Sequence, residues 1–128
     1  MAKPYYEFFC PVKVIAGNAA LEHIPFELAT LGAKRPLIIT DKGVRANGLL
    51  NPIEAAFSTT DAVIGHVFDD VPPDSSLEVV RLAAEAYRTN KCDAIIAVGG
   101  GSVIDTSKAT NILVSEGGDD LLQYSGAH

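Results

Sequence analysis

A short glycine-rich sequence is the feature of this chain best suited to binding an anion. The residues Gly-Gly-Gly-Ser at 99–102 directly follow the apolar stretch 94–98, and a helical pattern begins at Val103. Glycine permits a sharp turn and lets a ligand approach the backbone without obstruction by a Cβ atom. The first N–H groups of a helix lack acceptors and lie at the positive end of its dipole. A strand, glycine turn and helix in this order predict a pyrophosphate site, although a purely structural turn would have the same sequence.

The helix after the glycines has its own expected start signal. We expect Ser102 to cap this helix, with Asp105 three residues later as its capping-box partner. No base lies near Ser102 to activate it as a nucleophile, so we predict no catalytic residue in this chain. The glycines match neither the Gly-x-Gly-x-x-Gly fingerprint nor the phosphate loop of nucleotide triphosphatases. They also follow the third expected core strand, whereas the glycine loop of a Rossmann fold normally follows the first.

Asp41 is a second candidate, because it directly follows the apolar stretch 36–40. In open α/β sheets, ligands bind outside the carboxyl ends of the strands. A carboxylate there can accept both hydroxyls of an adenosine ribose and would repel a 2′-phosphate, which predicts a preference for NAD over NADP. The alternative is an ordinary turn aspartate next to Gly43. The loop 69–76 follows another expected strand and is placed to border the same crevice.

The histidines and cysteines show no metal-binding pattern. His23, His66 and His128 are not spaced as neighbours on one helix, and Cys10 and Cys92 form no Cys-x-x-Cys pair. We therefore predict neither a metal site nor a disulfide scaffold within residues 1–128.

The elements that must position these residues alternate between strands and helices. Apolar and β-branched stretches predict strands, and apolar residues spaced three and four apart predict helices. Alternation of this kind indicates an α/β fold with a parallel sheet flanked by helices and joined by right-handed crossovers. The expected order is a strand or hairpin within 5–15, then a helix at 21–31, a strand at 36–40, a helix at 44–58, a strand at 63–68, a helix from 77 to about 90, a strand at 94–98 and a helix from 103 to about 117.

Composition excludes several classes of protein. The chain has 128 residues, of which 48% are hydrophobic, and it carries a formal net charge of −6. This length and composition fit one globular domain, and an acidic chain is poorly suited to nucleic acid or an anionic membrane. No apolar run approaches the roughly 18 residues of a membrane span, and Met1–Val14 lacks a signal-peptide core. We therefore expect a cytoplasmic protein.

The candidate residues also resemble those of a known family. Residues 97–109 (Ala-Val-Gly-Gly-Gly-Ser-Val-Ile-Asp-Thr-Ser-Lys-Ala) resemble the GGGSxxDxxK motif of the iron-containing (group III) alcohol dehydrogenases. Residues 37–43 and 91–96 resemble the strand and turn that precede this motif in the family. Residues 8–17 with Ala20 and Leu21 resemble its N-terminal strand and first helix. The similarity covers nearly the whole chain.

The resemblance implies a Rossmann-like fold and an NAD(P)-dependent oxidoreductase that acts on primary alcohols, diols or aldehydes. It places Asp41 at the adenine ribose. Family members often carry Pro-Asn-Pro in the loop after the next strand, whereas Pro73 stands here at the position of the asparagine. The residues expected to bind NAD are Asp41, Gly99, Gly100, Gly101, Ser102, Val103 and Ile104.

The resemblance also implies more chain than is present. Family members have a second, helical domain with one Asp and three His ligands for iron (or zinc), which residues 1–128 do not contain. We therefore expect 1–128 to be the N-terminal NAD-binding domain of a longer dehydrogenase and to be inactive alone. The alternatives are a domain related to glycerol dehydrogenase or dehydroquinate synthase, and a non-catalytic nucleotide-binding module. The aromatic edge at 5–9 predicts a homo-oligomer, because unpaired edge strands recruit partners.

Overall fold

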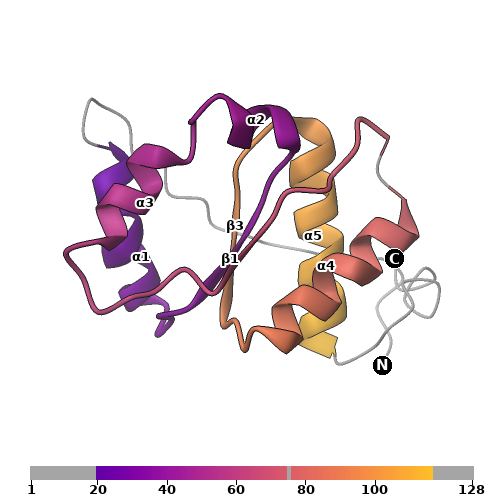
Figure 1. The fold of residues 1–128 in the computed structure, drawn as a ribbon. Coiled ribbons are helices and arrows are strands. Elements are labelled where there is room, and N and C mark those ends of the chain that lie inside the picture. The colour runs from indigo at the N-terminus through magenta and orange to yellow at the C-terminus, as the bar shows by residue number, and fades with distance from the viewer. Residues whose placement is uncertain (1–19, 75, 117–128) are drawn as a thin grey trace, which may run out of the picture.

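The computed structural model describes residues 20–74 and 76–116 (Figure 1). The N-terminal strand or hairpin expected at 5–15 lies outside these ranges. Within them, no helix is long and apolar enough to cross a membrane. The elements in chain order are η1 (Ala20–His23), α1 (Ile24–Thr30), β1 (Pro36–Ile39), α2 (Lys42–Ala46), α3 (Asn51–Phe57), β2 (His66–Phe68), α4 (Leu77–Thr89), β3 (Ala94–Ala97) and α5 (Gly101–Glu116).

The strands form one parallel sheet in the order β2-β1-β3, which confirms the expected α/β fold. Leu37 of β1 pairs with His66 of β2 on one side and with Ile95 of β3 on the other. All four residues of β1 are buried, as expected for a strand covered on both faces. By contrast, β3 is half-buried and ends exposed, although its apolar sequence predicted the most buried strand. The reason is position, since β3 lies at one edge of the described sheet.

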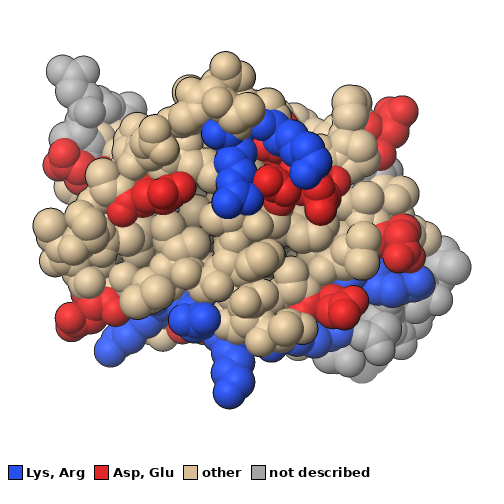
Figure 2. Space-filling view, in the orientation of Figure 1, with Lys and Arg blue, Asp and Glu red and all other residues tan. Residues whose placement is uncertain are grey.

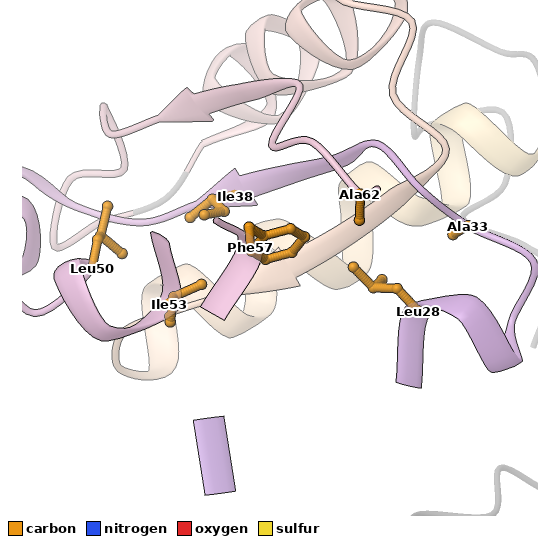
Figure 3. Packing of buried hydrophobic residues seen from close by; sticks show 7 residues of the cluster. All are labelled: Leu28, Ala33, Ile38, Leu50, Ile53, Phe57 and Ala62. Atoms are coloured by element: carbon orange, nitrogen blue, oxygen red, sulfur yellow. The ribbon is translucent and has the colours of Figure 1, made fainter. Parts of the chain in front are cut away.

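One face of the sheet is covered by α1 and α3 (Figure 3), and η1 packs in turn against these two helices. Ile38 lies at the centre of this face, because side chains alternate between the two faces of a strand. The buried side chains that surround it are Leu28, Ala33, Leu50, Ile53, Phe57 and Ala62.

The opposite face packs against α4 and α5 (Figure 1). Leu37 and Ile39, which flank Ile38 in β1, point into this second cluster. Ala83 of α4 and Val103 of α5 complete the contact with the strand. Burial of Val103 at 1% exposure fixes the start of α5 against the sheet.

Two of the expected helices are not continuous in the structure, and each interruption has a local cause. The helix expected from Leu21 begins as the 3-10 turn η1, and α1 proper starts with Pro25 in its first turn, where proline costs no hydrogen bond. The helix expected at 44–58 is two helices. Gly48, with φ of 72°, ends the first segment, and Pro52 begins the second.

Candidate functional site

A cavity of about 550 Å³ lies at the carboxyl ends of the three strands. Its walls come from the residues that follow each strand, namely 41–43 after β1, 69–73 after β2 and 100–103 after β3. This is the position at which open α/β sheets bind ligands. The expected border at loop 69–76 is confirmed for 69–73.

Thr40 holds the ends of the three strands together. Its N–H donates to the carbonyl of Phe68 at 2.8 Å, and its hydroxyl donates to the carbonyl of Val98 at 2.6 Å. Its own carbonyl accepts from the Val71 N–H at 3.4 Å. Thr40 is fully buried, so these bonds are shielded from water. One residue therefore sets the spacing between Asp41, the loop after β2 and the glycine turn.

Asp41 lines the cavity, and one oxygen of its carboxylate is already bonded within the fold. Oδ1 accepts the Val44 N–H at 2.8 Å and so caps α2. Among the described residues, Oδ2 accepts no hydrogen bond. The turn role and the ligand role that the sequence left open are therefore compatible. Oδ2 can accept a hydroxyl from a ligand while Oδ1 keeps its capping bond.

The three glycines of the turn have different environments. Gly99 has φ of 153°, and a Cβ atom there would lie 2.7 Å from Cγ2 of Val103. At Gly100 and Gly101, a Cβ atom would meet nothing within 4 Å, and both residues line the cavity. Gly99 is thus required by the fold, whereas Gly100 and Gly101 leave space that a ligand can enter.

The start of α5 differs from the expected capping box. The helix begins at Gly101, so Ser102 lies inside the first turn and is not its cap. The Ser102 hydroxyl donates instead to the carbonyl of Pro73. Asp105 is exposed on the helix. The prediction of a Ser102–Asp105 capping box was wrong, because the helix begins at Gly101, two residues before the expected start at Val103.

The Ser102 contact also connects two walls of the cavity. Pro73 stands where the resembling family has an asparagine, and here its main-chain carbonyl joins the loop after β2 to α5.

Charged side chains from α2 and from the loop after β2 form a network, seen in Figure 2 as blue and red atoms side by side. Lys42 and Arg45 pair with Asp69 and Asp70. The hydrogen bonds to Asp70 and Asp69 raise the pKa of Lys42 above its usual value. Partial burial works to raise the pKa of Asp69, but hydrogen bonds from Arg45 and Lys42 outweigh it and the pKa is lowered. Both shifts favour the charged forms, the ammonium of Lys42 and the carboxylate of Asp69.

The cavity gathers most of the residues that the sequence singled out. Asp41, Gly100, Gly101, Ser102 and Val103 all line it. Gly99 and Ile104 do not line it. Gly99 packs against the side chain of Val103, and Ile104 is 43% exposed on α5.

The sequence reasoning missed Thr40 and the charged network that includes Lys42 and Asp69. Their signal was a polar residue directly after a strand: Thr40 follows Pro36–Ile39, and Asp69 follows His66–Phe68.

The described residues do not fit a metal ion. Within 20–74 and 76–116 there is no group of three His, Cys, Asp or Glu side chains that could hold one. His66 is exposed on β2, and Cys92 is a buried free thiol. We therefore assign no metal-dependent step to these residues.

The fold defines a Rossmann-like α/β domain with a cavity at the carboxyl edge of its sheet. The sequence defines the family within that class. Residues 11–127 match the family model "Iron-containing alcohol dehydrogenase", and the chain belongs to this family.

Curated relatives and solved structures agree with this membership. The chain is 38% identical to a 4-hydroxybutyrate dehydrogenase of Cupriavidus necator over 78% of its length and 25% of the relative. It is 30% identical to a 1,3-propanediol dehydrogenase of Klebsiella pneumoniae over 98% of its length and 33% of the relative. An alcohol dehydrogenase from Oenococcus oeni superposes with a TM-score of 0.78 at 30% identity, covering 93% of this chain and 31% of that one.

One similar structure contains a coenzyme. A sulfoacetaldehyde reductase from Bifidobacterium kashiwanohense, solved in complex with NAD+, superposes with a TM-score of 0.79 at 25% identity. The match covers 94% of this chain and 31% of the reductase. The chain thus spans about a third or less of the length of the relatives it matches.

Proposed function

We propose that residues 1–128 form the NAD-binding domain of a dehydrogenase that transfers hydride between a small primary alcohol or aldehyde and NAD. The observation that carries the proposal is the cavity that joins Asp41 on one wall to residues 100–103 on another. A dinucleotide has a diol at its ribose and a diphosphate at its centre, and these two walls offer a carboxylate and helix-start amides.

Each end of the cavity has a separate task in this proposal. The first-turn amides of α5 donate to the diphosphate, because they have no carbonyl in a preceding turn. The open space at Gly100 and Gly101 lets the diphosphate approach the backbone. Oδ2 of Asp41 accepts an adenine-ribose hydroxyl. Bound NAD supplies the hydride chemistry, and the protein supplies its position.

The names of the relatives support the class of substrate. They include a 4-hydroxybutyrate dehydrogenase and a 1,3-propanediol dehydrogenase, both of which act on a small hydroxylated compound by name. For the whole protein we propose an activity of this type, with iron (or zinc) held by residues outside the described ranges.

Titration calorimetry with NAD+ tests the proposal directly. We expect saturable binding to the wild-type chain. Asp41→Asn should keep the cap of α2, because asparagine caps helices as well as aspartate does. It should also weaken the preference for NAD+ over NADP+ by about tenfold, because it removes one charge that repels a 2′-phosphate. Absence of NAD+ binding to a folded wild-type chain would refute the proposal.

We also propose a homo-oligomer through residues 5–9 and a cytoplasmic location. The aromatic composition of 5–9 supports the first, and the free thiol of Cys92 is in keeping with the second. A strictly monomeric species in sedimentation at high concentration would contradict the oligomer.

A further inference from the structure

Two cations on α2 are already held by carboxylates: Lys42, which lines the cavity, and Arg45, which shares Asp69 with Lys42. Nζ of Lys42 lies 2.7 Å from Oδ1 of Asp70 and 3.3 Å from Oδ1 of Asp69. Nη1 of Arg45 lies 2.9 Å from Oδ2 of Asp69. Lys42, Asp69 and Asp70 line the cavity together with Asp41, the residue proposed to face the ribose.

We propose that Asp69 and Asp70 are specificity-determining residues, which exclude a coenzyme with a 2′-phosphate by holding Lys42 and Arg45 in ion pairs. This inference rests on the proposed function. It assigns part of the coenzyme choice to residues other than Asp41.

The charge balance at the rim supports this role. A phosphate monoester carries about −1.5 to −2 charges at pH 7, and lysine and arginine are its usual partners in proteins. Both candidates for that role are engaged here. With Asp41, three carboxylates face two cations, so this part of the cavity is net negative. A 2′-phosphate would meet repulsion and no available cation.

Side-chain exposure shows which group is held in place where Asp69 pairs with Lys42 and Arg45. Asp69 is 22% exposed, whereas Lys42 and Arg45 are 73% and 51% exposed. Asp69 directly follows Phe68 at the end of β2, where the sheet sets its backbone. The carboxylate is therefore the anchor, and the long cationic side chains can turn to another anion once it is neutralised.

The test compares dissociation constants of NAD+ and NADP+ by calorimetry, using the full chain with Asp69→Asn, Asp70→Asn and both together. Each variant keeps the shape of the side chain and removes its charge. We expect the ratio of the NADP+ to the NAD+ constant to fall about threefold to tenfold in each single variant, and further in the double variant. Asp69→Glu should keep the wild-type ratio.

Glu78→Gln is the matched control. It also removes a carboxylate from an ion pair, with Arg81 at 3.2 Å, but it lies on α4 and does not line the cavity. The ratio should not change. Salt gives a second readout, since about 0.5 M salt should narrow the discrimination of the wild type by screening the rim charges.

The outcomes separate this inference from the proposed function. If the wild type binds NAD+ and the aspartate variants keep its ratio, the inference is overturned and the proposed function stands. An equal shift in Glu78→Gln would also overturn it, because net charge rather than the ion pairs would then be responsible. If the folded wild type binds neither dinucleotide, the proposed function fails first. Asp70 is 61% exposed, so its variant remains informative even if Asp69→Asn does not fold.

Discussion

At the scale of single residues, the glycine turn separates a structural from a binding requirement. Gly99 adopts a backbone conformation that side chains rarely take, and it packs against Val103. Gly101 occupies an ordinary helical position, and its missing side chain leaves part of the cavity open. The fold therefore requires glycine at position 99, whereas the open cavity requires it at position 101.

Substitution by alanine should distinguish the two glycines. Gly99→Ala should destabilise the fold by about 1–3 kcal/mol through backbone strain and contact with Val103. Gly101→Ala should leave stability within about 0.5 kcal/mol of the wild type and weaken NAD+ binding, because the new methyl group enters the cavity. Urea unfolding and calorimetry measure the two effects. Equal losses of stability in both variants would contradict this distinction.

At the scale of elements, the site depends on strand ends that stay in register. Thr40 bonds to Phe68, the last residue of β2, and to Val98, which follows β3. The sheet therefore fixes the positions of the cavity walls. Asp41 then caps α2 as the chain leaves β1. The ligand-facing groups are thereby placed by buried backbone contacts rather than by contacts between themselves.

Thr40→Val tests this dependence with a side chain of almost the same shape. The change removes the donor to the Val98 carbonyl, which should cost about 1–2 kcal/mol and loosen the glycine turn. NAD+ affinity should fall with it. Thr30→Val is the control, because its hydroxyl also donates to a carbonyl, that of Phe26, but at an exposed position of α1. An equal effect of the two substitutions would show that Thr40 has no special role.

At the scale of the whole molecule, β1 joins two cores. Ile38 belongs to the cluster beneath α1 and α3, and Leu37 and Ile39 belong to the cluster beneath α4 and α5. Figure 1 shows the two pairs of helices on opposite sides of the sheet. Cys92 lies in the second cluster, 9% exposed. Its protonation therefore affects the stability of the whole fold.

Stability should depend on pH through this thiol. Burial raises the pKa of Cys92, the neighbouring Asp93 also raises it, and Arg35 opposes the shift. The folded state then favours the neutral thiol, so its contribution is complete below the unfolded pKa of about 8.5 and is lost as pH rises through the folded pKa. The stability of the wild type relative to Cys92→Ala should fall between about pH 8 and pH 10 in urea unfolding. Parallel pH profiles for the two proteins would contradict this expectation.

Much of the fold could be predicted from the sequence, because apolar stretches and caps are local signals. The strand at 36–40, the Ser76 cap of α4 and the turn at Gly32 all follow from such signals. Pro52 indicates in the sequence an interruption of the helix at 44–58, but the place of the break depends on the conformation of Gly48, which the apolar spacing does not reveal. The strand expected at 63–68 is shorter, although Val63 and Gly65 still bond to Lys34 and Pro36.

Only the part of the candidate site that has local sequence signals could be predicted. Asp41 and the glycine turn have recognisable neighbours in sequence. The bonds of Thr40 and the pairing of Lys42 with Asp70 depend on which strands lie side by side, and that order is a property of the folded sheet.

We propose that a nicotinamide dinucleotide binds between Asp41 and the start of α5. The most direct measurement is amide NMR of the isotopically labelled chain during titration with NAD+. We expect the largest chemical-shift changes at the amides of residues 100–103, and a second set of changes at the amides of residues 41–43. Largest changes on the α1 and α3 side of the sheet, or none at saturating NAD+, would contradict it.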